Sequence, residues 1–132
     1  MSATGLPTDS PFAPMEPGRL VYENAEVLAF YDQYPVSPGH TLVVSKHVTA
    51  SLFDLPADQQ NALWRASPEV RRALQERHAP AGFNIGLNDG PAAGQTINHA
   101  HIHIIPRYKG DQADPRGGVR WIFPETARYW KG

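Results

Sequence analysis

The sequence contains no cysteine, which limits what the protein can be. Without thiols it has neither a disulfide framework nor a thiolate metal cluster. Its 12 basic and 13 acidic residues give a net charge of −1, so no overall positive field favours nucleic acid or an anionic membrane. We find no apolar run that could span a bilayer and no signal-peptide pattern. We therefore expect a cytoplasmic protein whose partners include neither nucleic acid nor membrane.

The length of 132 residues suits one compact domain, which we place over residues 1–132. Residues 1–18 are rich in proline, serine, threonine and glycine, and we expect them to form a loose, extended N-terminal arm. Residues 108–132 are polar and interrupted by turn residues, and we expect a C-terminal tail. The domain proper should therefore lie between these two segments.

Short apolar segments separated by turn residues predict about five strands. Two are expected within residues 18–32, around a turn at Glu23 and Asn24, and the others within 40–46, 82–89 and 95–105. In the fourth strand Phe83, Ile85 and Leu87 should point inward, and Pro106 should end the fifth. One main helix is expected between residues 51 and 78. Pro68 should either kink or restart this helix, and the helical spacing predicts that Trp64 lies in the core. The predicted class is α+β, an antiparallel sheet covered by a helix.

Three histidines alternate with apolar residues in "HAHIHII", residues 99–105. On a strand, His99, His101 and His103 would share one face of the sheet. They could be polar residues on a solvent-exposed strand. They could also be metal ligands, since a His-x-His pair can chelate zinc. They could also be catalytic. A neutral imidazole is a good nucleophile toward phosphorus when its other nitrogen is held as a hydrogen-bond donor.

This run resembles the signature of the histidine triad family, in which three histidines alternate with apolar residues. Three more segments resemble the family pattern in the same order, namely "LAFYDQYPVSPGH", "VSPGHTLVVSKHV" and "NIGLNDGPAAGQ". The resemblance covers roughly residues 19–107. It implies the fold of that family, an antiparallel sheet of about five strands with a main helix, and two-fold homodimers.

The resemblance also implies a catalytic set. His101 matches the histidine that attacks the α-phosphorus of a nucleotide and forms a nucleotidyl-histidine, which water then hydrolyses. His103 matches the histidine near the scissile oxygen, a candidate for protonating the leaving group. His99 and His40 match an orienting pair. Histidine at position 103 favours hydrolysis over transfer, because the uridylyl-transferring branch has glutamine there.

The same resemblance implies contacts to the substrate. Gln95, Thr96 and Asn88 match residues that donate hydrogen bonds to the α-phosphate. Asp32 matches the acidic residue that accepts both ribose hydroxyls, while Leu28 and Phe30 match an apolar slot for the base. The implied substrates are nucleoside 5′-phosphoric anhydrides or phosphoramidates, with diadenosine tetraphosphate as the first candidate. Within the family, the chain resembles bacterial dinucleoside polyphosphate hydrolases of the fragile-histidine-triad or Hint type.

The sequence departs from many relatives at a structural zinc site. Where those relatives carry Cys-x-x-Cys, this chain has Ser10 and Ala13, and His47 has therefore lost its expected partners. We expect no structural zinc and no obligatory cofactor, although a divalent cation could accompany a polyphosphate. We leave His78 as a surface residue, whereas Lys46, Arg107 and, in the tail, Arg116, Arg120 and Trp121 could face distal phosphates or a base.

Two alternatives remain open at this point. A protein of the same fold could bind nucleotides or partners and turn them over negligibly. A metal-dependent hydrolase could instead use the histidines as ligands. Turnover of an adenosine phosphoramidate distinguishes the first alternative, and loss of activity with a chelator distinguishes the second.

Overall fold

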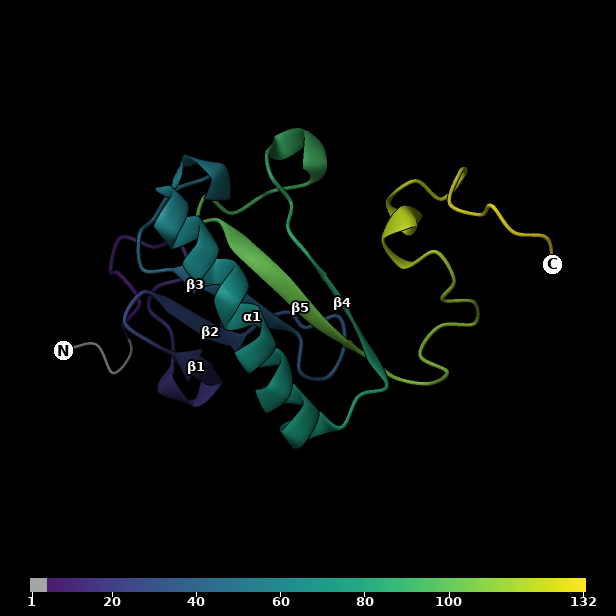
Figure 1. Cartoon of the computed structure of the whole chain (residues 1–132), viewed down its shortest axis with the longest axis horizontal. Coiled ribbons are helices and arrows are strands. Elements are labelled where there is room, and N and C mark those ends of the chain that lie inside the picture. Colours follow the sequence, from purple (N-terminus) through teal and green to yellow (C-terminus); the bar gives the residue numbers. More distant parts are fainter. Residues whose placement is uncertain (1–4) are drawn as a thin grey trace.

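A computed structural model describes residues 5–132, and it is built on a single antiparallel sheet (Figure 1). The strands are β1 (Leu20–Glu23), β2 (Val27–Tyr31), β3 (Thr41–Ser45), β4 (Gly82–Gly86) and β5 (His101–Arg107). They lie in the order β1-β2-β3-β5-β4, and all four neighbouring pairs are antiparallel. The strand that carries His101 and His103 therefore lies between two others, as the α+β prediction requires.

One face of the sheet is covered by the single long helix, α1 (Ala57–His78) (Figure 1). Val70 and Leu74 on the helix pack with Val43, Ile102 and Ile104 on the sheet, and all five side chains have no exposed surface. Burial of such side chains is the main favourable term in folding. The alternation along β5 therefore sends Ile102 and Ile104 to the helix and the histidines to the opposite face.

Helix α1 runs without interruption through Pro68, so the predicted restart at this residue does not occur. A proline inside a helix leaves the carbonyl group of residue i−4 without its hydrogen bond, here that of Trp64. Trp64 and Pro68 are both exposed, so that carbonyl group lies on the solvent side of the helix. The hydroxyl group of Ser67 donates a hydrogen bond to the carbonyl oxygen of Leu63 and closes the adjacent turn.

Two expectations about apolar residues and one about a strand end are wrong. Trp64 is not in the core, because its side chain is 42% exposed on the outer part of α1. Ile85 was expected to point inward, but it is 45% exposed on β4, which forms an edge of the sheet. Pro106 does not end its strand; it pairs with Phe83 inside β5. The strand continues because Pro106 lies beyond the part of β5 that pairs with β3. Only β4 pairs with β5 there, so the N–H group that proline lacks is not needed for pairing on the other side.

The N-terminal arm is not loose over its described part, residues 5–18. Leu6 and Met15 are 4% and 8% exposed, and they pack in a second core with Leu28, Phe30 and Leu42. Leu42 pairs with Phe30 on one side and with His103 on the other, so these strand residues lie on the same face of the sheet as the histidines. The arm therefore covers part of the face opposite α1. Residues 1–4 of the expected arm lie outside the described residues.

The C-terminal tail, residues 108–132, lies beside the β4 edge of the sheet (Figure 1). It contains one short 3-10 turn, Gly118–Ile122, and it packs largely on itself. The guanidinium group of Arg116 stacks over Trp130, and Ala127 is buried. None of the helices described within residues 5–132 is long and apolar enough to cross a membrane.

Candidate active site

Four histidines meet on the sheet face opposite α1. His101 and His103 lie on β5, where they pair with Val44 and Leu42 of β3. His40 immediately precedes β3, and His99 lies in a bend two residues before β5 begins. His99 is therefore not part of the strand, although it was predicted to alternate with the other two. It lies deeper, with no exposed surface.

The ring of His101 has one nitrogen held by the backbone. Its Nδ1 atom lies 2.8 Å from the carbonyl oxygen of His99. A carbonyl oxygen only accepts hydrogen bonds, so Nδ1 carries the proton and the neutral ring has its lone pair on Nε2. This is the tautomer that a nucleophilic imidazole needs. The ring is also packed at 4.9 Å, centroid to centroid, against His103.

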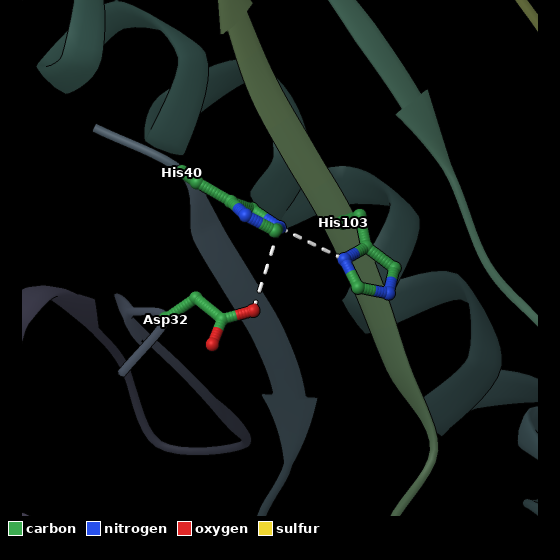
Figure 2. Close-up of side chains that lie close together, drawn as sticks. All are labelled: Asp32, His40 and His103. Carbon is green, nitrogen blue, oxygen red and sulfur yellow. Dashed lines mark hydrogen bonds and ion pairs between the residues drawn. The ribbon is translucent and has the colours of Figure 1, made fainter. Parts of the chain in front are cut away.

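His40 and His103 form a directed hydrogen-bond chain (Figure 2). The backbone N–H group of Val36 donates to Nδ1 of His40 at 3.1 Å, so the proton of a neutral His40 is on Nε2. That Nε2–H group lies 2.9 Å from Nδ1 of His103. His103 therefore accepts at Nδ1 and carries its own proton on Nε2. Its outer nitrogen is a donor, whereas that of His101 is an acceptor.

Three of these histidines have lowered pKa values. Burial lowers the pKa of His103 from 6.5 to about 4, and the nearby His101 and His40 rings add to the effect. Burial also lowers the pKa of His40, although Asp32 opposes it, and burial lowers the pKa of His99. All three are therefore neutral at pH 7. The hydrogen-bond directions deduced for neutral rings then apply at that pH.

Asp32 stands at the end of the histidine chain, just after β2. Its Oδ1 atom accepts the N–H group of Tyr34 at 2.9 Å, and its Oδ2 atom lies 3.6 Å from Nε2 of His40 (Figure 2). A cavity of about 310 Å³ opens beside the carboxylate. Phe12, Leu42 and Ile97 are among its walls. One carboxylate thus faces both the histidines and a cavity with partly apolar walls.

The expected apolar slot is built differently from the prediction. Leu28 and Phe30 have no exposed surface, because the N-terminal arm covers them. The ring of Phe12 lies 5.3 Å from that of Phe30, edge on, and stands between it and the cavity beside Asp32. Direct contact of a base with Leu28 or Phe30 would need the arm to move. Phe12, which is half-buried, lines the cavity with its aromatic ring instead.

The loop between β4 and β5 carries the three residues expected at the phosphate. Asn88 is exposed and lines a cavity of about 380 Å³ together with His40 and His103. Thr96 is also exposed. Gln95 differs from the expectation, because its amide is used inside the protein. Its Nε2 atom donates to the carbonyl oxygens of Ala50 and Ile97, and its Oε1 atom accepts the N–H group of Gly90.

This use of both ends of the Gln95 amide closes the loop around Gly90. Gly90 and Gly94 both have φ angles near 95°, a conformation that favours glycine. Both amide hydrogens of Gln95 are thus used in holding the loop. To donate to a phosphate, as expected, Gln95 would have to give up these hydrogen bonds.

The cationic side chains expected near the substrate are mostly paired. Lys46 bonds to Glu23 at 2.8 Å, and Arg107 bonds to Asp111 and Asn84. In the tail, Arg116 binds Asp114, and Arg120 donates to backbone carbonyl groups.

Trp121 and Arg107 help to line a cavity of about 490 Å³, which shares Val36, Asn84, Ile105 and Gly118 with the cavity beside His103. His78 is half-buried, and its Nε2 atom lies 3.0 Å from the hydroxyl group of Tyr31.

Two places could be considered for a metal within residues 5–132. Asp32, His40 and His103 offer ligand atoms within 4.8 Å of one another. The two nitrogens are 2.9 Å apart, a hydrogen-bond distance and shorter than the roughly 3.3 Å that two ligands of tetrahedral zinc require. At the other place, Ser10 bonds to His99, Ala13 has no ligand atom and His47 is exposed. Neither group of residues fits zinc as arranged.

Sequence reasoning missed the residues that hold the histidines from outside the motif. These are Ser10, Phe12 and the backbone groups of Val36 and Ser45. Backbone contacts leave no trace in residue identity. The arm did carry a signal, because Leu6, Phe12 and Met15 are large apolar residues within an otherwise polar, proline-rich segment.

Comparison with known proteins agrees with this fold. The HIT domain family model matches residues 14–110, and the chain belongs to this family. It is 41% identical over 96 residues to "Protein hit" of Bacillus subtilis, covering 72% of this chain and 66% of that protein. It is 34% identical over 97 residues to the bifunctional bis(5′-adenosyl)-triphosphatase/adenylylsulfatase of Arabidopsis thaliana, covering 74% and 54%. The chain thus matches between about half and two thirds of the length of these relatives.

A solved structure gives the same result at the level of the fold. The crystal structure of SMU.412c from Streptococcus mutans superposes with a TM-score of 0.72 at 36% identity, covering 86% of this chain and 75% of that one. The predicted family and the predicted α+β fold are therefore confirmed.

Proposed function

We propose that this protein is a nucleotide hydrolase that cleaves nucleoside 5′-phosphoric anhydrides or phosphoramidates at the α-phosphate through a covalent nucleotidyl-His101. One observation carries the proposal. The hydrogen bond from Nδ1 of His101 to the carbonyl oxygen of His99 leaves the lone pair of the neutral ring on Nε2, and the ring lies on the sheet face opposite α1. An acceptor at His101 next to a donor at His103 is what attack at phosphorus and departure of the leaving group need.

In the first step, the Nε2 lone pair of His101 forms a bond to the α-phosphorus while the bond to the leaving atom breaks. The Nε2–H group of His103 donates a hydrogen bond to that leaving atom. A phosphate leaving group departs as an anion and needs no proton at neutral pH. His103 is held in its donor tautomer by His40 and orients the leaving atom through this hydrogen bond. An amine leaving group also takes up one proton from solvent, because a neutral His103 that gave up its own proton would become an imidazolate anion.

In the second step, water attacks the α-phosphorus and the phosphorus–nitrogen bond breaks. The electron pair returns to Nε2 of His101, and one proton of the water is released to solvent, where it balances the proton that an amine leaving group took up. The net reaction consumes one water molecule. Fixed donors around the equatorial oxygens stabilise such a transition state more than a strong base does, and Asn88 and Thr96 are exposed at the right loop to supply them.

The substrate would lie across the two cavities. We assign the nucleoside to the cavity with Asp32 and Phe12, and the leaving group to the cavity with His103 and Asn88. Diadenosine tetraphosphate is the first substrate to test, supported by the dinucleoside polyphosphate activity named for the Arabidopsis relative. The proposal includes a homodimer, supported by the edge position of β4 in the sheet and by the exposed Trp64, and a cytoplasmic location.

The decisive experiment is to trap the covalent species. The protein would be mixed with an adenosine phosphoramidate, quenched within milliseconds, digested and examined by mass spectrometry. An adenylyl group on the peptide containing His101, formed no more slowly than turnover, is the expected result. Nucleotide binding without any adduct or product would favour a binding protein of the same fold instead.

A further inference from the structure

Ser10 connects the N-terminal arm to the histidines through a hydrogen bond. Its Oγ atom lies 2.6 Å from Nδ1 of His99, although the two residues are 89 positions apart. Ser10 is 4% exposed and His99 has no exposed surface. Water therefore cannot replace this hydrogen bond without rearrangement of the arm.

The direction of the hydrogen bond follows from the other partner of His99. Its Nε2 atom lies 2.8 Å from the carbonyl oxygen of Ser45, which only accepts, so Nε2 carries the proton. Nδ1 then holds the lone pair, and the hydroxyl group of Ser10 must donate to it. The same Oγ atom accepts the N–H group of Phe12 at 3.1 Å. The ring of His99 is thus held at both nitrogens, in one tautomer.

The position of His99 matters because its carbonyl oxygen holds the proton of His101. His99 lies in a bend outside the sheet, so no strand pairing orients that carbonyl group. Its neighbour Ala100 is anchored by a hydrogen bond to the carbonyl oxygen of Thr49 at 2.8 Å. The hydrogen bonds at the two nitrogens of the His99 ring, with Ser10 and Ser45, also anchor this bend.

Ser10 also supports the wall of the nucleoside cavity. The ring of Phe12 stands edge on to that of His101, at 5.3 Å and 89°, and lines the cavity beside Asp32. Because Phe12 donates its N–H group to Ser10, one hydroxyl group sets both the His99 ring and the start of this wall.

From this geometry we infer that Ser10 is a positioning residue for the reaction: through His99 it holds His101 in the tautomer and orientation needed for attack on phosphorus. The inference rests on the proposed function, in which His101 is the nucleophile. Ser10 itself touches neither the substrate nor the reacting atoms. Its removal should therefore slow formation of the nucleotidyl-histidine and leave nucleotide affinity nearly unchanged.

The test compares Ser10→Ala and Ser10→Thr with Ser67→Ala. Ser67 is a matched control, since it is also a buried serine whose hydroxyl group bonds within the protein, but it lies on α1, behind the sheet. Rapid quenching with an adenosine phosphoramidate gives the rate of adduct formation, and calorimetry gives the Kd for AMP. Thermal unfolding gives the stability of each variant.

We expect Ser10→Ala to lower the rate of adduct formation by about 10- to 100-fold, because small misalignments of a nucleophile cost rates of that order. The Kd for AMP should change by less than about fivefold, which separates positioning from binding. Ser10→Thr, which keeps the hydroxyl group, should recover most of the rate. Ser67→Ala should react at the wild-type rate even where its stability loss matches that of Ser10→Ala. A wild-type rate in Ser10→Ala overturns the inference.

A second measurement remains informative if Ser10→Thr is destabilised by its extra methyl group or if the wild type forms no adduct. ¹⁵N NMR of the imidazoles reports which nitrogen of His99 and of His101 is protonated. We expect Ser10→Ala to change the Nδ1 signals of both residues. An unchanged His101 signal overturns the inference. Absence of an adduct in the wild type, with both signals altered in Ser10→Ala, would instead refute the proposed function and leave the positioning intact.

Discussion

His40 donates a hydrogen bond to His103 over 2.9 Å, and this contact determines which nitrogen of His103 faces the cavity. The donor state of His40 is imposed in turn by the backbone N–H group of Val36. The result is a pair of neighbouring imidazoles with opposite roles, an acceptor on His101 and a donor on His103. Two chemically identical side chains are thus differentiated by what lies behind them.

Replacing His101 with alanine should abolish turnover, because the atom that forms the bond to phosphorus is removed. Nucleotide affinity should survive within about tenfold, or 1.4 kcal/mol. Turnover of an adenosine phosphoramidate and calorimetry with AMP measure the two effects. Hydrolysis at the full rate by His101→Ala would exclude the covalent route, and His101→Gly supplied with a nucleotide bearing a good leaving group offers a more direct check.

Asp32 should select ribonucleotides if its carboxylate accepts the ribose hydroxyls. Asp32→Ala should weaken AMP more than 2′,3′-dideoxy-AMP by about tenfold or more, since each hydrogen bond to a charged acceptor contributes on the order of 1.5–3 kcal/mol. The Kd values of both ligands would be measured by calorimetry.

Asp32→Asn separates ribose binding from support of the turn at Tyr34. Its amide oxygen can still accept the N–H group of Tyr34, which Oδ1 accepts in the wild type. The amide nitrogen can only donate, so it cannot accept a hydrogen bond from a ribose hydroxyl group. Both variants should therefore lose ribose selectivity. If Asp32→Asn keeps it, Asp32 acts through the turn alone.

The stability of the protein should fall as the pH is lowered from about 6.5 to about 4. The pKa of His103 is lowered from 6.5 to about 4, chiefly by burial, and those of His40 and His99 are lowered for the same main reason. Between these pH values the unfolded chain binds more protons than the folded one, so protonation favours unfolding; above 6.5 the effect is absent.

Each of these groups can contribute at most about 1.4 kcal/mol per pH unit, and less where solvent screens it. Urea unfolding at several pH values measures the slope. His103→Gln removes one of the three groups, so its slope should be shallower than that of the wild type. Equal slopes would mean that folding does not lower the pKa of His103.

A chelator should leave turnover of a phosphoramidate unchanged, and the purified protein should contain no stoichiometric zinc. The reason is that the facing nitrogens of His40 and His103 are joined by a hydrogen bond at 2.9 Å, too close for two ligands of a tetrahedral zinc. Elemental analysis and activity with and without EDTA provide the measurements. One tightly held zinc per chain, with activity lost on its removal, would favour the metal-dependent alternative. Magnesium could still assist with a polyphosphate by neutralising its charge.

The fold could be predicted largely from local patterns. Alternating residues in "HAHIHII" and the β-branched run before Lys46 reported the strands, because one face of each must be buried. The errors arose where tertiary surroundings decide. Pro68 was expected to interrupt the helix, but the unpaired carbonyl group faces solvent there, and the proline is tolerated. Trp64 has the helical spacing of a core residue and lies just outside the covered face.

The N-terminal arm shows the same limit at the site. Its composition is that of a loose segment, yet Leu6 and Met15 are buried because the sheet offers an apolar face that α1 does not cover. No local pattern reports such a distant partner. Leu28 and Phe30 were accordingly expected to face a base, whereas the arm covers them and presents Phe12 instead.

The sequence alone determined which chemical groups this protein can use: four histidines, a carboxylate at position 32 and a glycine-bounded loop, in an order that identifies the family. Only the tertiary structure decided what each imidazole can do. The state of a histidine depends on the donor or acceptor at each ring nitrogen, and here those partners are Ser10, Val36 and two backbone carbonyl groups. Folding brings these partners together from segments far apart in the chain, and backbone atoms are the same in every residue, so the sequence cannot display them.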